Sequence, residues 1–189
     1  MPGSKLPDHL TAIVLLACVV VGCKQVQSLA QPTVLKSPDG KFQLTIPAGW
    51  RENSSLNDQA EIKAGNSLAE MYVIVITEAK ADFTDETTLE HFTKITQDSM
   101  MSNLESVDAS PPVPLTINGN AGRQYMMKGV TKNVKLAYLI TNVETAAHFH
   151  QIVCWTLQSR INRNQTTLQK ITETFRPSPR GGTDGTAPP

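Results

Sequence analysis

Two histidines, His148 and His150, are separated by one residue in an apolar stretch, and this spacing is the clearest hint of metal chemistry in the sequence. Alternate residues of a β-strand point to one face, so the two imidazoles would lie close enough to share a metal ion. The other potential ligands are distant in sequence and could approach only through the tertiary fold; they are Asp82, Asp85, Glu86 and His91. We therefore predict no metal site and keep His148 and His150 as candidates for ligand binding. The alternative for the pair is a polar strand face that solvent or a helix covers.

Two further side chains could do chemistry, Trp50 and Cys154. Trp50 could stack on a ligand, but it follows Pro47 and Gly49, which end a strand, and a core-filling role is the alternative. Cys154 lies in an apolar run, which is typical of a buried structural thiol. No G-x-S-x-G motif surrounds a serine, and no glycine-rich phosphate loop is present. We predict no catalytic residue and no cofactor.

Another cysteine, Cys23, closes an apolar run near the amino terminus. Leu10 to Val21 is uninterrupted apolar sequence, and it is too short to span a bilayer, which needs about 20 residues. Its length is typical of the central region of a signal peptide. The run ends Val20-Val21-Gly22-Cys23, which resembles a bacterial lipobox. This resemblance implies cleavage after Gly22 and a diacylglyceryl group on the Cys23 thiol; the alternative is an ordinary secretory signal.

The sequence divides into four segments on this reading. Residues 1–22 are the lipoprotein signal peptide, 23–37 a lipidated tether, 38–177 a folded domain and 178–189 a disordered tail rich in Pro, Gly and Thr. Cleavage removes Cys18 and acylation blocks Cys23, so Cys154 has no partner for an intramolecular disulfide. We expect the protein in the cell envelope, held to a membrane by its lipid.

The charge composition excludes some partners. Lysine and arginine total 17 and so do aspartate and glutamate, which gives no net charge. A duplex nucleic-acid binder needs a basic stripe, so we expect no nucleic-acid partner.

Hydrophobic patterning predicts β-β-β-α-β-β-β-α, with strands near 42–46, 59–64, 69–79, 120–130, 134–143 and 148–157. Amphipathic helices are predicted over 85–104 and 162–175. The acidic residues before the first helix favour its positively polarised end. Short connections between the later strands require antiparallel pairing, and one sheet with two helices is the economical packing.

This order resembles the PsbP-like family (Mog, PsbP and DcrB types). The resemblance rests on FQLTIPAGW at 42–50, INGNAGRQY at 117–125 and ITETFRP at 171–177. It implies an α+β fold, an antiparallel sheet flanked by helices in an α/β/α sandwich, and a non-enzymatic interaction protein.

Our function hypothesis is a membrane-anchored lipoprotein whose domain binds another envelope protein. The alternatives are a small-ligand or metal-binding lipoprotein and a photosystem-associated accessory protein.

Overall fold

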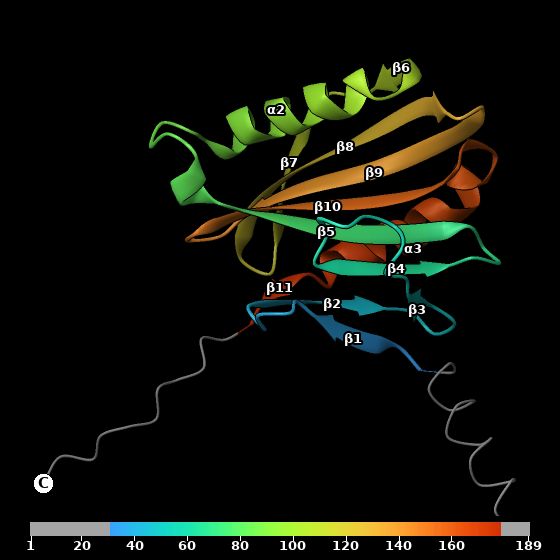
Figure 1. The fold of residues 1–189 in the computed structure, drawn as a ribbon, viewed down its shortest axis with the longest axis horizontal. Coiled ribbons are helices and arrows are strands. Elements are labelled where there is room, and N and C mark those ends of the chain that lie inside the picture. Colours follow the sequence, from blue (N-terminus) through green and yellow to red (C-terminus); the bar gives the residue numbers. More distant parts are fainter. Residues whose placement is uncertain (1–30, 179–189) are drawn as a thin grey trace, which may run out of the picture.

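The computed structural model describes residues 31–178, which form two antiparallel sheets and two α-helices (Figure 1). The strands are β1 (Thr33–Lys36), β2 (Phe42–Ile46), β3 (Arg51–Glu52), β4 (Ile62–Asn66), β5 (Met71–Ala79), β6 (Glu105–Ala109), β7 (Val113–Ile117), β8 (Asn120–Thr131), β9 (Val134–Glu144), β10 (His148–Leu157) and β11 (Arg176–Pro177). The helices are α2 (Leu89–Ser102) and α3 (Ile161–Glu173), with short 3-10 helices η1 (Lys80–Asp82) and η2 (Gln158–Arg160). The predicted α+β class is confirmed.

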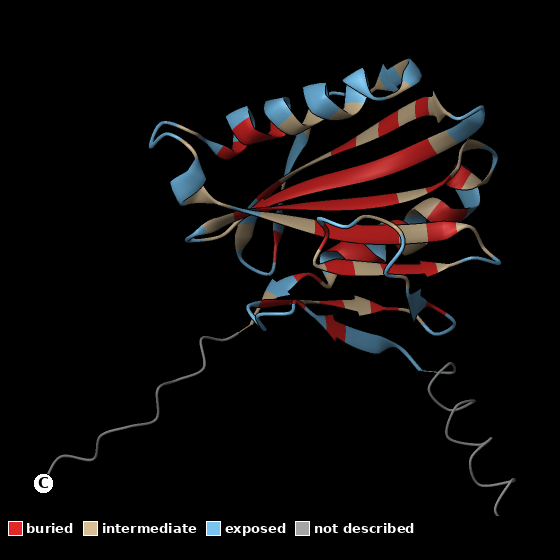
Figure 2. Ribbon diagram, viewed as in Figure 1, coloured by how far each residue is buried: buried red, intermediate tan, exposed pale blue. Residues whose placement is uncertain are grey.

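The large sheet has the strand order β3-β4-β5-β10-β9-β8-β6, and β7 also pairs with β8. Its centre consists of β5, β10 and β9, whose near-continuous apolar sequence predicts burial on both faces. Cys154 of β10 pairs with Val73 on one side and Leu139 on the other, and all three are buried. Helix α2 covers one face of this sheet, while α3 and the small sheet β1-β2-β11 lie against the other (Figures 1 and 2).

Helix α2 begins at its cap residue Thr88, whose hydroxyl accepts a hydrogen bond from the His91 amide. This hydroxyl caps the helix directly, and Glu90 is the acidic residue of the first turn. Phe92 then stacks on Phe149 of β10 with ring centroids 4.6 Å apart, which fixes the helix on the sheet. The helix has 14 residues, shorter than the predicted 85–104, because it begins only after its cap residue Thr88 and the chain leaves it at Asn103 for β6.

Of the hairpin β7–β8, only the second strand was predicted, near residues 120–130. Asn118 and Gly119 occupy its two-residue turn with φ of 47° and 83°, the left-handed region that Asn and Gly tolerate best. Ile117 pairs with Asn120 directly across it. The strands β6 and β7 escaped prediction because they lie at the sheet edge and bury few side chains.

The small sheet corrects the predicted tether. Residues 33–36 were assigned to it, but they form β1 and pair with β2 along its whole length, from Thr33 with Ile46 to Lys36 with Gln43. Leu35 and Ser37 are buried. The tether prediction is therefore wrong for residues 33–37, and it failed because Leu35 is the one buried side chain of β1 and gives no visible alternation.

A second core, on the face of the large sheet opposite α2, lies between that sheet, α3 and the small sheet. Phe42 and Leu44 of β2 meet Leu168 and Ile171 of α3 there, and all four are almost fully buried. Phe175, after the helix, completes the cluster and contacts Phe42 with ring centroids 5.6 Å apart. None of the helices within residues 31–178 is long and apolar enough to cross a membrane.

Candidate functional site

The two candidate histidines lie at one end of the domain, where the β9–β10 turn approaches the turn between β1 and β2. An open groove of about 570 Å³ runs between the two turns. Its lining includes Asp39 and Lys41 from the small sheet, Thr145 from the β9–β10 turn, and both His148 and His150. The structure therefore brings the two candidate histidines together with the charged turn between β1 and β2.

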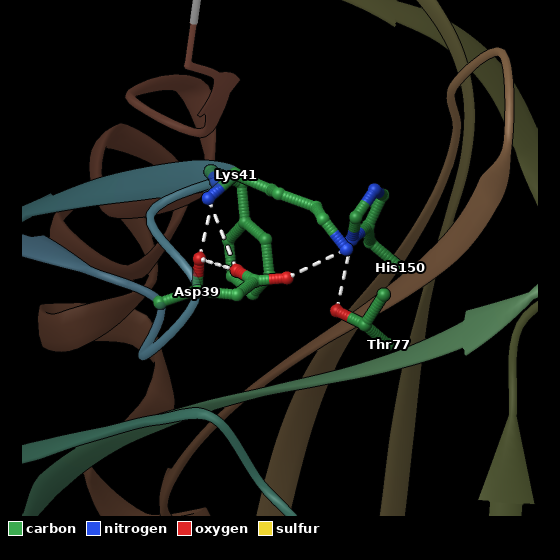
Figure 3. Close-up of polar contacts among 6 residues, drawn as sticks. Asp39, Lys41, Thr77 and His150 are labelled. Atoms are coloured by element: carbon green, nitrogen blue, oxygen red, sulfur yellow. Dashed lines mark hydrogen bonds and ion pairs between the residues drawn. The ribbon is translucent and has the colours of Figure 1, made fainter. Parts of the chain in front are cut away.

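His150 is held between the sheets rather than presented to solvent. Its ring lies 5.0 Å from the Phe42 ring and 4.9 Å from the Phe175 ring, and the residue is 4% exposed. Nδ1 lies 3.0 Å from the Thr77 hydroxyl, and Nε2 lies 3.2 Å from the Thr145 hydroxyl (Figure 3 shows the Thr77 contact). Both ring nitrogens therefore already have hydrogen-bond partners.

These contacts assign the tautomer of His150. The Thr145 hydroxyl donates its proton to the backbone carbonyl of His148 at 3.1 Å, so it accepts from Nε2–H of His150. Nδ1 then accepts from the Thr77 hydroxyl. Burial in this apolar setting lowers the pKa of His150 to about 4, with a further contribution from the neighbouring His148, while Asp39 acts in the opposite direction. The buried imidazole is neutral at physiological pH.

The geometry does not assemble a metal centre at the histidine pair. The His148 and His150 rings lie on one strand face with centroids 5.8 Å apart, as the alternation predicts. Within residues 31–178, however, no group of three His, Cys, Asp or Glu residues could hold a metal ion. His148 is the member of the pair that a ligand in the groove could contact without breaking the hydrogen bonds of His150.

The charged wall of the groove is a tightly ordered turn (Figure 3). Asp39 Oδ1 accepts hydrogen bonds from the Ser37 hydroxyl at 2.7 Å and from the Lys41 amide at 3.0 Å. Its other oxygen forms an ion pair with Lys41 Nζ at 3.0 Å. These donors, the Ser37 hydroxyl foremost, hold the pKa of Asp39 well below its usual range. Gly40 permits the turn, since its φ is +70°.

The other candidate side chains are part of the core. Trp50 is 5% exposed and belongs to the cluster beneath the small sheet, so a ligand could not stack on it without opening that core. Cys154 is fully buried, as predicted, with its sulfur 3.7 Å from the Thr172 hydroxyl. Burial raises the pKa of the Cys154 thiol to about 12, so the thiolate is not populated.

The predicted cleavage at Gly22 and lipidation at Cys23 lie outside the described residues, as do the signal segment 1–22 and residues 179–189 of the predicted tail.

The hydrogen-bond partners of His150 were not predicted from the sequence. Thr77 is three residues beyond Ile74 in a strand read only for its apolar side chains, and its pairing with His150 depends on the β5–β10 register. No local sequence pattern predicts the register in which β5 and β10 pair.

Solved structures share this architecture. The solution structure of cyanobacterial PsbP (CyanoP) from Synechocystis sp. PCC 6803 matches with a TM-score of 0.59 at 11% identity, over 79% of this chain and 94% of that one. This chain has the PsbP-like fold.

Two further matches come from other bacteria. LpqN of Mycobacterium tuberculosis, described as involved in cell envelope biogenesis, matches with a TM-score of 0.56 at 16% identity, over 79% of this chain and 91% of that one. A Pseudomonas aeruginosa protein of unknown function, PA94, matches with a TM-score of 0.51 at 12% identity, over 79% and 99%. No protein-family model and no curated protein matches the sequence. The likeness therefore rests on the fold, as expected at these identities.

Proposed function

We propose that the chain is a lipoprotein, anchored to a cell-envelope membrane through acylated Cys23, whose non-catalytic PsbP-like domain binds another envelope protein. The observation that carries the anchoring is the sequence Val20-Val21-Gly22-Cys23 at the end of an apolar run too short to span a bilayer. Two or three acyl chains anchor stably where one gives only marginal binding.

The binding role is supported by the fold and by the candidate site. LpqN, which shares the fold, is tied to envelope biogenesis, and this supports an envelope role for the present domain. Three side chains that could do chemistry are committed to the structure of the domain: His150 to two threonines, Cys154 to the core and Asp39 to its turn. A surface that acts by contact with a partner fits this arrangement better than a reaction centre does.

Anchoring is tested by the mass of the mature protein and by membrane fractionation. The wild type should begin at Cys23, carry acyl chains and sediment with membranes. Cys23→Ala should keep its signal segment and lose the lipid, whereas Cys18→Ala is the matched control and should behave as the wild type. A wild-type protein without acyl chains would refute the anchoring.

Partner binding is tested by crosslinking in intact cells followed by purification of the anchored protein. A stoichiometric envelope protein should be recovered with the wild type, and not with an unrelated domain fused to residues 1–32. Equal recovery by both baits would show that the anchor alone sets the association and would refute binding by the domain.

Small-ligand binding is a second candidate, favoured by the groove beside His148. His148→Ala should then weaken ligand binding in calorimetric titration, while the exposed His91→Ala should not. An unchanged affinity in both variants would exclude His148 from the ligand site.

A further inference from the structure

Four connections lie at the end of the domain opposite the histidine groove, and the pairing registers place them together. Thr33, where β1 begins, pairs with Ile46 just before the β2–β3 turn. Gly49 of that turn lies against Asn66, at the start of the β4–β5 turn. Met71, at the end of the β4–β5 turn, pairs with Thr156 near the end of β10. The described chain therefore begins at the same end as the β4–β5 hairpin tip (Figure 1).

The β8–β9 tip and the start of α3 complete this end. Thr156 also pairs with Ala137, three residues beyond the tip residue Val134. Arg160, just before α3, donates a hydrogen bond to the Leu68 carbonyl at 3.3 Å. We call this surface the hairpin-tip end. Its exposed or half-exposed side chains include Leu68, Val134, the basic residues Lys132, Lys135, Arg160 and Arg163, and the acidic residues Glu70, which pairs with Arg160, and Glu105, which lies opposite Val130.

The hairpin-tip end combines exposed apolar groups with positive charge. Leu68 is 95% exposed at the β4–β5 tip and Val134 is 43% exposed at the β8–β9 tip. Lys132, Lys135 and Arg163 are exposed, and no ion pair within residues 31–178 includes them. A single exposed apolar residue needs no explanation. Apolar tips set among unpaired cations are the combination that the boundary of an anionic bilayer accommodates.

The opposite end has more acidic than basic residues, although the whole chain is neutral. β5 ends there, β10 begins there, and α2 starts beyond them, as the pairing of His148 with Ala79 shows. Its acidic residues are Asp39, Glu78, Asp82, Asp85, Glu86, Glu90 and Glu144. Three of them have a Lys or Arg partner, which leaves four unpaired in the described chain, against the two unpaired cations Lys36 and Arg176 at this end. An anionic membrane surface would attract the hairpin-tip end of the domain and repel the acidic end.

The short chain before β1 determines which of the two differently charged ends lies near the membrane. Nine residues, 24–32, separate Cys23 from Thr33, and even fully extended they reach no more than about 35 Å. An acylated Cys23 would therefore keep the hairpin-tip end near the bilayer. A contact made under such tethering is intramolecular and needs little intrinsic affinity.

We propose that the hairpin-tip end is a membrane-contacting surface, on which Leu68 and Val134 enter the lipid boundary while Lys132, Lys135 and Arg163 bind anionic headgroups. This inference rests on the proposed acylation of Cys23. It gives the anchored domain a fixed orientation, with the acidic end and the histidine groove turned away from the membrane.

The test measures the orientation of the acylated full-length mature protein in vesicles. A fluorophore is attached either at Ser67→Cys, beside Leu68, or at Ala81→Cys, at the acidic end; both positions are exposed. Labelling is selective because Cys154 is buried and acylation blocks Cys23. Vesicles of phosphatidylcholine, with or without phosphatidylglycerol, carry a quencher on the lipid headgroup. Quenching should be severalfold stronger at position 67 than at 81, and strongest with phosphatidylglycerol.

Two variants test the chemistry of the contact. Replacing Lys132, Lys135 and Arg163 with Gln should weaken the contact about fivefold per charge and reduce the difference between the two labels. Replacing Lys94, Lys170 and Arg176 with Gln changes the net charge equally at other exposed positions and should leave the difference unchanged. Leu68→Ser should reduce quenching at position 67 in both kinds of vesicle.

The outcomes separate this inference from the proposed function. Acylated protein in which both labels are quenched equally overturns the orientation and leaves the anchoring intact. A mature protein without acyl chains overturns the anchoring, and the orientation with it. If the hairpin-tip charges prove necessary for crosslinking to a protein but not for quenching, that end is a protein interface and the membrane contact is refuted.

Discussion

His150 makes the stability of this domain depend on pH in a defined direction. The imidazole lies between the Phe42 and Phe175 rings with both nitrogens hydrogen-bonded to threonines, and its pKa is lowered from 6.5 to about 4. A proton added to the folded state would place a charge in an apolar core. The unfolded chain meets no such cost.

The sign and the size follow from proton linkage. Between pH 6.5 and pH 4 the unfolded state binds a proton at His150 and the folded state does not, so the free energy of unfolding falls as the pH falls. Above pH 6.5 both states are neutral and the residue contributes no pH dependence. A shift of this size corresponds to about 3 kcal/mol lost by pH 4.

The assay is urea unfolding of a soluble fragment, residues 31–189, at a series of pH values. His150→Gln removes the titrating group while keeping hydrogen-bonding atoms, so its stability should fall less than that of the wild type between pH 6.5 and 4. His91→Gln, exposed on α2, is the matched control and should follow the wild type. If wild type and His150→Gln lose the same free energy over this window, the linkage argument is refuted.

Three further predictions concern the framework around this site. Starting the fragment at Ser37 instead of Gln31 removes β1 and the buried Leu35, and should lower the free energy of unfolding by about 2–3 kcal/mol in urea titrations; an unchanged midpoint would contradict the role of β1. Phe92→Ala removes the ring stacked on the sheet beneath α2 and should cost about 3–5 kcal/mol by the same measurement, whereas a loss below 1 kcal/mol would show that α2 is not held there. Cys154 should react with a thiol reagent only in denaturant, and rapid labelling of the native fragment would contradict its burial.

Much of the framework could be predicted from the sequence, because its central elements carry strong patterns. The strands around Val73, Leu139 and Cys154 are apolar on both faces, and both helices carry a clear apolar stripe. The small sheet could not be predicted from local pattern. β1 has a single buried side chain and β11 has two residues, so each exists only because β2 lies between them.

The candidate site was predictable only as a pair of histidines on one strand face. The alternation of β10 placed His148 and His150 together, as the structure shows. It could not show that His150 is buried, because that burial depends on Phe42 and Phe175 from elements remote in the chain. Nor could it separate the charges into two ends, since charge separation is a property of the folded topology.

The small sheet also bears on the order in which the domain can fold during synthesis. Its middle strand, β2, is among the earliest parts of the domain to be synthesised, yet Gln43 pairs with Arg176 and Phe42 packs on Phe175 near the other terminus. Pairings this remote in sequence form late, because the intervening chain must be ordered before they can close. A partly synthesised chain lacks both α3 and the last strand, so its second core stays uncovered. The domain therefore cannot complete its fold until the last strand has been synthesised.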